Sequence, residues 1–300
     1  MDREKYLEAV LTLPTLEEPL VSQDGRWAAW TWYRTGPAAD VYAAPTDASA
    51  PPLRLSETAH DTIVVSWSPL ALLSSTGRRS IIVSQDRDGD ERAQLFRIDL
   101  DQPGVMQPLT EPSPGFFLRG GQLHPNGRWL IYAANWDEEA GREIEPTWIY
   151  RHDLETGQRV ALARPRRGCY YEPSLNKPGT HILYRRNDRH PAGRQVWLVD
   201  IEGREDREIV DAGAEKKAFA SWFPGGQRAL VLAETDTHQR VGVWHMESGN
   251  LHWVLDDPAR NVESAYVPHG SDRAVILESK GARVQASFLD TGTGEEGTLP

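Results

Sequence analysis

The chain has 300 residues, of which 39% are hydrophobic, and a formal net charge of −11 at neutral pH. This composition supports a large core and argues against nucleic acid as a partner. The only cysteine is Cys169, which excludes an internal disulfide, and no apolar run is long enough for a signal peptide or a membrane span. We therefore expect a cytoplasmic protein with no membrane segment.

The first predicted element is a short helix over residues 2–13. Together with the segment that leads into the propeller, it makes up residues 1–17. Tyr6 and Val10 share one face of this helix, and Pro14 ends it. Every later element that the sequence predicts is a β-strand. We therefore expect an all-β protein with one short helix in front of it.

The stretch from Leu123 to Gly157 has the organisation of a hairpin. Residues 124–127 (His-Pro-Asn-Gly) form a tight turn, because Pro presets φ and Asn-Gly accepts positive φ. Residues 128–135 and 147–154 are predicted strands, and residues 155–157 make a closing turn. A single hairpin does not bury its apolar face, so the same pattern should recur.

The turn does recur along the chain, at intervals of 44 to 52 residues between its glycines. A period of this length with about four short strands per unit is typical of a β-propeller. We predict an all-β propeller of six four-stranded blades, or an incomplete seven-bladed one. The repeat glycines are Gly25, Gly77, Gly127, Gly179, Gly226 and Gly270. The predicted blades of the 18–300 propeller are about 18–60, 61–115, 116–168, 169–217, 218–261 and 262–300.

One repeat departs from the pattern. Residues 70–76 (Leu-Ala-Leu-Leu-Ser-Ser-Thr) stand between Pro69 and Gly77, where the other repeats need only one or two residues. This is an insertion in the turn. Its apolar residues indicate either a contact surface or a locally altered sequence, and the sequence leaves both open.

Motifs for catalysis and for metal binding are not found. The acidic stretch 86–91 resembles a calcium loop, but Gly89 is its fourth residue and Arg97 its twelfth, whereas a standard loop has Gly sixth and Glu twelfth. The nine histidines are scattered, and neither Gly-x-Ser-x-Gly nor a phosphate-binding Gly-x-x-x-x-Gly-Lys occurs. We predict no catalytic residue, no metal and no cofactor.

The candidate binding residues are in the loops that lead into the first strand of each blade. In a propeller those strands line the central channel, so their loops should gather at one mouth. These loops are rich in aromatic and charged residues, although ordinary connections would satisfy the same pattern. The candidates are His60, Asp61, Phe117, Arg119, Tyr170, Tyr171, Glu172, Lys216, Lys217 and Glu263.

Three stretches carry a resemblance to a known family: 22–30 (SQDGRWAAW), 84–100 (SQDRDGDERAQLFRIDL) and 124–135 (HPNGRWLIYAAN). They resemble the N-terminal propeller of the prolyl oligopeptidase family, and its acylaminoacyl-peptidase-like branch above all. In that family the propeller screens peptides by size and precedes an α/β-hydrolase domain that carries the catalytic triad. The resemblance implies a non-catalytic gating domain, with a peptide or a hydrolase domain as its partner.

Two other functions stay open at this point. A similar turn repeat occurs in Tol-system propellers, which makes a stand-alone peptide- or protein-binding propeller the main alternative. A propeller enzyme with its own site would need carboxylates or a metal set at the channel, and Asp61, Glu172 and Glu263 are the only contributors in these loops. The sequence leaves open the ligand, the oligomeric state and whether a hydrolase domain belongs to the protein.

Overall fold

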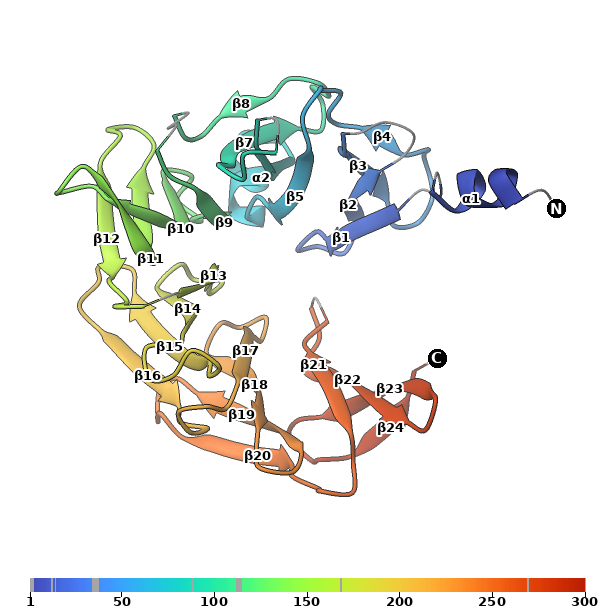
Figure 1. The fold of residues 1–300 in the computed structure, drawn as a ribbon, viewed down its shortest axis with the longest axis vertical. Coiled ribbons are helices and arrows are strands. Elements are labelled where there is room, and N and C mark those ends of the chain that lie inside the picture. Colours follow the sequence, from blue (N-terminus) through green and yellow to red (C-terminus); the bar gives the residue numbers. More distant parts are fainter. Residues whose placement is uncertain are drawn as a thin grey trace. The chain divides into compact units, whose positions relative to one another are not determined.

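The computed structural model describes residues 3–11, 13, 15–33, 38–87, 89–111, 115–167, 169–268 and 270–299. Over these residues it contains two helices and six four-stranded sheets, whose neighbouring strands follow one another in the sequence. These sheets are the blades of a β-propeller, as the repeats predicted, and we call them blade 1 to blade 6 in chain order (Figure 1). The chain falls into two compact units, residues 1–130 and residues 131–300.

The first unit contains α1, blade 1, blade 2 and the first strand of blade 3. Its helices are α1 (Arg3–Leu11) and α2 (Leu70–Thr76). Blade 1 consists of β1 (Thr15–Val21), β2 (Trp27–Tyr33), β3 (Asp40–Pro45) and β4 (Leu53–Arg54). Blade 2 consists of β5 (Thr62–Trp67), β6 (Ser80–Gln85), β7 (Gln94–Asp99) and β8 (Gln107–Pro108), and β9 is Leu118–Leu123.

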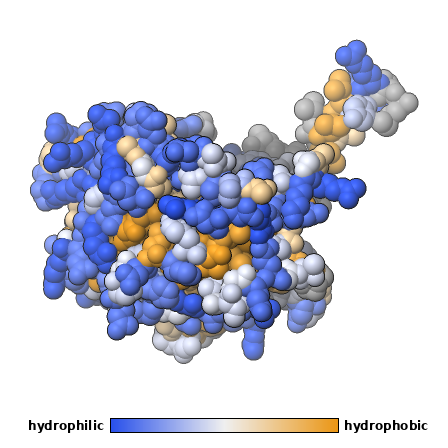
Figure 2. All heavy atoms as spheres, turned by 90° about the horizontal axis from the view of Figure 1, so that it is seen from below, coloured by the Kyte–Doolittle hydropathy of each residue, from blue (hydrophilic) through white to orange (hydrophobic). Residues whose placement is uncertain are grey.

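The predicted N-terminal helix is confirmed as α1. Its described side chains are all exposed, among them Tyr6 at 51% and Leu7 at 47%. Figure 2 shows this segment as an arm that carries hydrophobic residues in solvent. Neither α1 nor α2 is long and apolar enough to cross a membrane.

The insertion at residues 70–76 is a helix, α2, which the sequence did not predict. Seven residues between a proline and a glycine give too short a pattern for helical periodicity to stand out. The helix ends at Gly77, which has a φ of 69° and donates its N–H to the Leu73 carbonyl at 2.9 Å. Leu70 donates its N–H to the Gln23 side chain at 3.1 Å. Helix α2 thus contacts the repeat turn of blade 1 through this bond, and both interpretations of the insertion stay open.

In the first unit, burial alternates along most of β5 but is continuous over the first four residues of β3 and of β6. Ala29, Val41 and Ile81 are fully buried and belong to one apolar cluster shared by blades 1 and 2. Between the blades, the indole N–H of Trp67 donates to the Leu20 carbonyl at 3.0 Å. A directional bond thus fixes β5 against β1, in addition to apolar packing.

The repeat turn of blade 1 also contacts blade 2 through an ion pair. Asp24 accepts from both terminal nitrogens of Arg79, at 3.1 and 2.5 Å, and these side chains are 21% and 15% exposed. Asp24 further accepts from the Ser22 hydroxyl at 2.7 Å and from the Arg26 N–H at 3.2 Å. One carboxylate therefore holds both the shape of its own turn and the contact between two blades.

The second unit contains the rest of blade 3 and blades 4 to 6. Blade 3 has the order β12-β11-β10-β9, with β10 (Trp129–Asp137), β11 (Arg142–Asp153) and β12 (Arg159–Ala163). Blade 4 consists of β13 (Cys169–Leu175), β14 (His181–Arg186), β15 (Gln195–Asp200) and β16 (Asp206–Val210). Blade 5 consists of β17 (Ala218–Trp222), β18 (Arg228–Glu234), β19 (Gln239–His245) and β20 (Leu251–Leu255). Blade 6 consists of β21 (Val262–Tyr266), β22 (Arg273–Lys280), β23 (Arg283–Asp290) and β24 (Glu296–Thr298).

The second unit repeats the tryptophan contact of the first. The indole N–H of Trp222, at the end of β17, donates to the Ser174 carbonyl of β13 at 2.8 Å. Trp67 has the same place at the end of β5 and bonds to β1. Some tryptophans of the sequence therefore supply a specific bond between consecutive blades besides their apolar area.

A buried histidine in blade 3 gives the fold a predicted dependence on pH. His152 of β11 is 5% exposed, and its Nδ1 atom has no hydrogen-bond partner among the described residues. Burial lowers the pKa of His152 to about 4, and the nearby charge of Arg159 acts in the same direction. The folded chain thus keeps the ring neutral at pH values where the unfolded chain binds a proton, so stability should fall as the pH falls through 6.5.

We expect this histidine to remove about 2 kcal/mol of unfolding free energy between pH 7 and pH 5. The measurement is urea unfolding at both pH values for the native chain and for His152→Gln, which has no titrating ring. The loss on acidification should be smaller in the variant by about that amount. An equal loss in both proteins would mean that His152 does not cause it.

Each blade has two ends, which carry different loops. Because neighbouring strands are antiparallel, the loop that enters a blade and the loop between its second and third strands lie at the same end, which we call the strand-entry end. The repeat glycine turns and the closing turns lie at the opposite end. The candidate residues from the sequence are therefore all at the strand-entry ends of their own blades.

Candidate functional site

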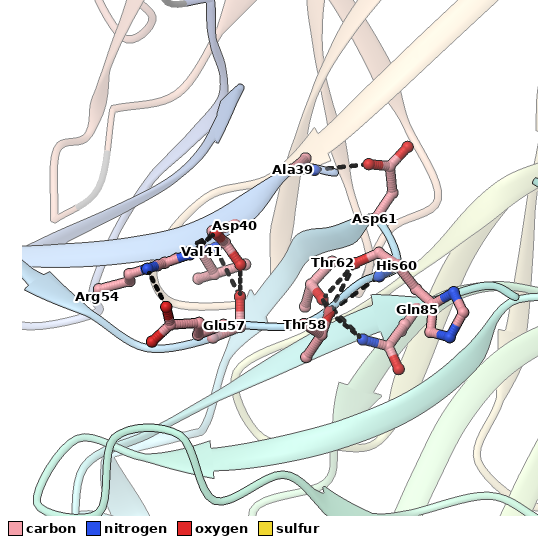
Figure 3. Close-up of polar contacts among 11 residues, drawn as sticks. Ala39, Asp40, Val41, Arg54, Glu57, Thr58, His60, Asp61, Thr62 and Gln85 are labelled. Atoms are coloured by element: carbon pink, nitrogen blue, oxygen red, sulfur yellow. Dashed lines mark hydrogen bonds and ion pairs between the residues drawn. The ribbon is translucent and has the colours of Figure 1, made fainter. Parts of the chain in front are cut away.

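The best-defined loop at a strand-entry end connects blade 1 to blade 2 and carries His60 and Asp61. The Asp61 carboxylate points back to blade 1 and accepts the Ala39 N–H at 2.6 Å (Figure 3). The Thr62 N–H donates to the Ala39 carbonyl at 3.0 Å. Asp61 is thus held against the start of β3, which makes this loop a rigid part of the blade joint.

Hydroxyl and amide groups fix the backbone around His60. The Thr58 hydroxyl donates to the His60 carbonyl at 2.7 Å, and the Gln85 side-chain amide donates to the hydroxyls of Thr58 and Thr62 at 2.9 Å each. Figure 3 shows these groups together at the ends of neighbouring strands. The imidazole of His60 is therefore presented by a backbone that is already ordered, which lowers the entropy cost of binding a ligand there.

A second polar group supports the same loop from its other side. Arg54 pairs with Asp40 at 2.6 Å and with Glu57 at 2.8 Å. The Ser56 hydroxyl donates to Asp40 at 3.2 Å and accepts the Val41 N–H at 2.9 Å. These bonds connect the outer strand β4 to the loop, so we assign Asp40 and Arg54 a positioning role.

Tyr33, at this end of the first unit, is influenced by three carboxylates. Burial raises the pKa of Tyr33, and the negative charges of Asp61, Glu17 and Asp86 raise it further. Asp61 lies in the loop into β5, Glu17 belongs to β1 and Asp86 directly follows β6. The three carboxylates therefore act on the Tyr33 hydroxyl at this end of the first unit.

Phe117 and Arg119, predicted from the loop that enters blade 3, contact each other. The Arg119 guanidinium lies 4.6 Å from the centroid of the Phe117 ring. Its Nη1 atom donates to the carbonyls of Glu91 and Leu118 at 3.2 and 3.0 Å. The two candidates thus form one aromatic and cationic group that lies against the hairpin between β6 and β7.

In the second unit, Glu172 is the candidate with the most unusual backbone. It has a φ of 80°, which non-glycine residues rarely adopt, and it lies where the pairing of β13 with β14 is interrupted between Tyr170 and Ser174. Its carboxylate is 78% exposed and lies 4.0 Å from Arg185. The side chains of Tyr170 and Tyr171 are outside the described part of the structure, so their predicted role remains a prediction.

The sequence missed three residues at the strand-entry ends of blades 4 and 5. The guanidinium groups of Arg185 and Arg194 lie 5.1 and 5.9 Å from the centroid of the Phe219 ring. Arg185 belongs to β14 and Phe219 to β17, while Arg194 forms a parallel bridge with Lys217. The second-to-third-strand loops share this end with the entering loops, and that topology was the signal that could have found Arg194.

The remaining candidates contact residues of their own blade hairpins. The Lys216 ammonium pairs with Asp236 at 2.7 Å, and the Lys217 N–H donates to the Glu234 carboxylate at 2.8 Å. Glu263 accepts a hydrogen bond from the Ser279 hydroxyl. These contacts order the side chains at the strand-entry ends of blades 5 and 6.

No set of three His, Cys, Asp or Glu side chains arranged for a metal occurs among the described residues. In the acidic stretch 86–91, the Asp90 carboxylate accepts the Arg92 N–H at 2.9 Å and the Asp86 carboxylate accepts the Glu91 N–H at 3.3 Å. These carboxylates shape a hairpin turn, while Asp88 lies outside the described residues.

Comparison with known proteins identifies the fold. No protein-family model and no curated protein sequence matches the chain. Among solved structures, a puromycin-hydrolysing peptidase of Mycobacterium tuberculosis is 15% identical with a TM-score of 0.73, over 95% of this chain and 46% of that one. A prolyl endopeptidase is 16% identical with a TM-score of 0.71, over 100% and 45%. TolB from Acinetobacter baumannii is 14% identical with a TM-score of 0.57, over 94% and 62%.

These likenesses confirm the resemblance that the turn motifs indicated. The neighbours include the N-terminal propellers of prolyl oligopeptidase-family peptidases, and they cover nearly the whole chain. The chain spans less than half the length of those two peptidases. At this identity the likeness shows the fold alone, and TolB shares the same fold, so function has to be argued from the strand-entry ends.

Proposed function

We propose that this chain is a non-catalytic propeller that binds peptide segments at the strand-entry ends of its blades, as the gating domain of a prolyl oligopeptidase-like peptidase would. The observation that carries the proposal is the chemistry of these ends. Within each unit they combine aromatic rings, guanidinium groups and carboxylates: Phe117, Arg119 and Asp61 in the first unit, and Phe219, Arg185 and Glu172 in the second. A peptide offers the matching partners, since it carries charged termini, apolar side chains and backbone groups.

Loops that are already ordered bind more tightly, because binding then loses less conformational entropy. Asp61 and the backbone of His60 are held by hydrogen bonds of 2.6 and 2.7 Å before any ligand arrives. Glu172 keeps a φ of 80°, and such backbone strain is found preferentially where a site requires it. A partner that is itself a folded domain, such as an α/β-hydrolase, would use the same ends.

The main alternative is a stand-alone binding propeller of the TolB kind. It is favoured by the fold likeness to TolB, which covers 94% of this chain. The two functions differ in the partner, because a gating domain works with a hydrolase whereas a stand-alone module binds a peptide or protein by itself. An acylaminoacyl substrate preference would follow only from the gating function.

The test is titration of the purified chain against a peptide library and against a separately expressed α/β-hydrolase domain. We expect binding without turnover, and we expect Arg119→Ala to weaken it by about 1 to 3 kcal/mol, as anchor arginines do. The matched control is Arg204→Ala, an exposed arginine in the turn after β15, at the opposite end of its blade.

Two outcomes would contradict the proposal. Hydrolysis of peptidyl substrates by the chain alone would show that it is catalytic. Equal affinity of the native chain and Arg119→Ala, together with a loss in Arg204→Ala, would move the site to the other end of the blades. Binding to the hydrolase domain alone, or to peptides alone, decides between gating and stand-alone function.

A further inference from the structure

The outer edge of blade 6 is covered over only part of its length. Its third strand, β23, has eight residues, whereas its fourth strand, β24, has three. β24 pairs with residues 287–289 of β23 and ends there. Residues 283–286 therefore have no strand on their outer side among the described residues. Apart from the ladder with β22, no hydrogen bond joins them to another part of the described chain.

In blades 1, 2, 4 and 5 the outer edge of the third strand is covered almost to its start. The Val41 N–H of blade 1, for example, donates to the Ser56 hydroxyl just beyond β4 at 2.9 Å. The first covered residue of each third strand is its second or third residue: Val41, Leu95, Val196 and Val241. In blade 6 the first covered residue is Ser287, the fifth of β23.

Blade 3 differs from blade 6, although its fourth strand is also shorter than its third. β12 pairs with residues 149–152 of β11, which begins at Arg142. The part of β11 beyond this pairing includes Pro146, which has no N–H and is typical of an edge that resists further pairing. Residues 283–286 contain no proline, so their edge keeps all its backbone donors.

Two residues of this open stretch direct their backbone groups outward. Asp290, at the end of β23, donates its N–H to the Glu295 carbonyl on the outer side at 2.8 Å. Successive residues of a strand alternate in the side to which their N–H and C=O point, and β23 pairs with β22 without a register shift. Val284 and Ala286 therefore point their N–H and C=O to the outer side, as Asp290 does. An extended backbone supplies the matching acceptors and donors.

The side chain of Val284 adds an apolar position to this edge. It is 61% exposed. In an antiparallel pair, directly opposite residues contact each other on the same face of the sheet. The residue of an added strand that lies opposite Val284 would cover this apolar surface, which favours a β-branched apolar side chain there.

We propose that an extended segment of the peptide ligand pairs with residues 283–286 as an antiparallel strand, with an apolar side chain opposite Val284. These residues directly follow the turn between β22 and β23, at the strand-entry end of blade 6. The inference rests on the proposed peptide-binding function and assigns a main-chain binding mode to it. The N–H and C=O groups of Val284 and Ala286 supply the hydrogen bonds, so sequence preference is confined mainly to the position opposite Val284.

The experiment uses the peptide Lys-Thr-Val-Thr-Val-Lys with an amidated C-terminus and an N-terminal fluorescein. Fluorescence anisotropy gives its affinity for the full chain. Two further forms carry N-methyl groups on both valines or on both threonines. Alternate residues of a strand face the same edge, so one methylated form loses the N–H donors that face β23 and the other keeps them. We expect one form to bind about tenfold or more weakly, and the other to stay within about twofold of the parent peptide.

Two variants of the chain test the same edge from the protein side. Val284→Pro removes one outward N–H and should weaken the parent peptide about tenfold, because proline is accepted at a sheet edge but cannot donate. Val284→Thr is the matched control. It keeps the N–H and the β-branched shape and should stay within about threefold of the native affinity. Urea unfolding of both variants checks that the fold is kept, and the methylated peptides test the inference on the native chain.

Equal binding of the two methylated forms, or an unchanged affinity in Val284→Pro, would contradict the strand-pairing mode and leave the proposed function standing. The same conclusion would follow if this peptide did not bind while members of the peptide library did. If no peptide binds at all, both proposals are wrong. A dimer in sedimentation that Val284→Pro converts into a monomer would assign the edge to a second copy of the chain and overturn the inference.

Discussion

Replacing Asp24 by alanine is expected to lower the free energy of unfolding by about 2 to 4 kcal/mol, because it leaves a largely buried guanidinium without its partner. Arg79 is 15% exposed and donates two hydrogen bonds to Asp24, across the joint between blades 1 and 2. The same substitution removes the acceptor for the Ser22 hydroxyl in the repeat turn. Urea unfolding of the native chain and the variant measures the difference.

The control is Asp272→Ala in the second unit. Asp272 pairs with Arg228 at 2.9 Å, but its side chain is 82% exposed, so solvent screens the pair. We expect a loss below about 1 kcal/mol there. Similar losses at the two aspartates would show that burial of the Asp24 pair does not matter.

The stability that Asp24 contributes should also depend on pH. Burial alone would raise the pKa of Asp24, but hydrogen bonds from Arg79, Ser22 and the Arg26 N–H outweigh it and hold the pKa well below its usual range. The folded carboxyl therefore stays ionised at pH values where the unfolded one is protonated. Its contribution is present above about pH 4 and is lost as the pH falls below that value. The Asp24→Ala variant should lose less stability than the native chain over that interval.

Replacing Gly127 by valine is expected to cost about 2 to 3 kcal/mol, from two separate causes. Gly127 has a φ of 73°, as its Asn-Gly motif predicted, and a β-branched residue resists this conformation. A Cβ atom at this position would also lie 2.7 Å from the Cδ2 atom of Leu72 in α2. The side chain of Leu72 can move partly away, so backbone strain should supply the larger share.

Gly25→Val separates the two causes. Gly25 has nearly the same φ, 70°, but a Cβ atom there would meet nothing within 4 Å. The extra loss at Gly127 relative to Gly25 therefore measures the contact with α2, and a Leu72→Ala background should abolish this extra loss. Chemical denaturation of the four variants gives these values. A valine at position 127 that leaves the midpoint unchanged would show that the turn does not need its glycine.

The parts of the fold that could be predicted from the sequence are the turns and strands whose pattern recurs along the chain. The turn at Gly127 was predictable because Asn-Gly chemistry repeats at a regular spacing. Helix α2 was not, because it occurs in one blade only and is too short for periodicity. The contact of Arg79 with Asp24 was hidden for another reason, since pairing between blades depends on how sheets pack and not on local pattern.

The same distinction applies to the candidate site. His60 and Asp61 could be proposed because they precede a predicted strand, and the position of a loop follows from the repeat alone. Arg185 and Phe219 belong to strands, and the sequence alone predicts no more for them than a place in a sheet. Only the packing of β14 against β17 reveals that the two side chains meet.

The tryptophan bonds between blades bear on how a propeller gains a blade by duplication of a repeat. Trp67 bonds to Leu20 in the first unit, and Trp222 bonds to Ser174 in the second. In each case the donor is at the end of the first strand of a blade, and the acceptor is a backbone carbonyl in the first strand of the preceding blade. Backbone carbonyls are present in every blade, so a tandem duplication that carries the tryptophan finds its acceptor already in place. This bond would then carry over to a duplicated blade, although the apolar packing between blades, as in the cluster shared by blades 1 and 2, would still have to fit.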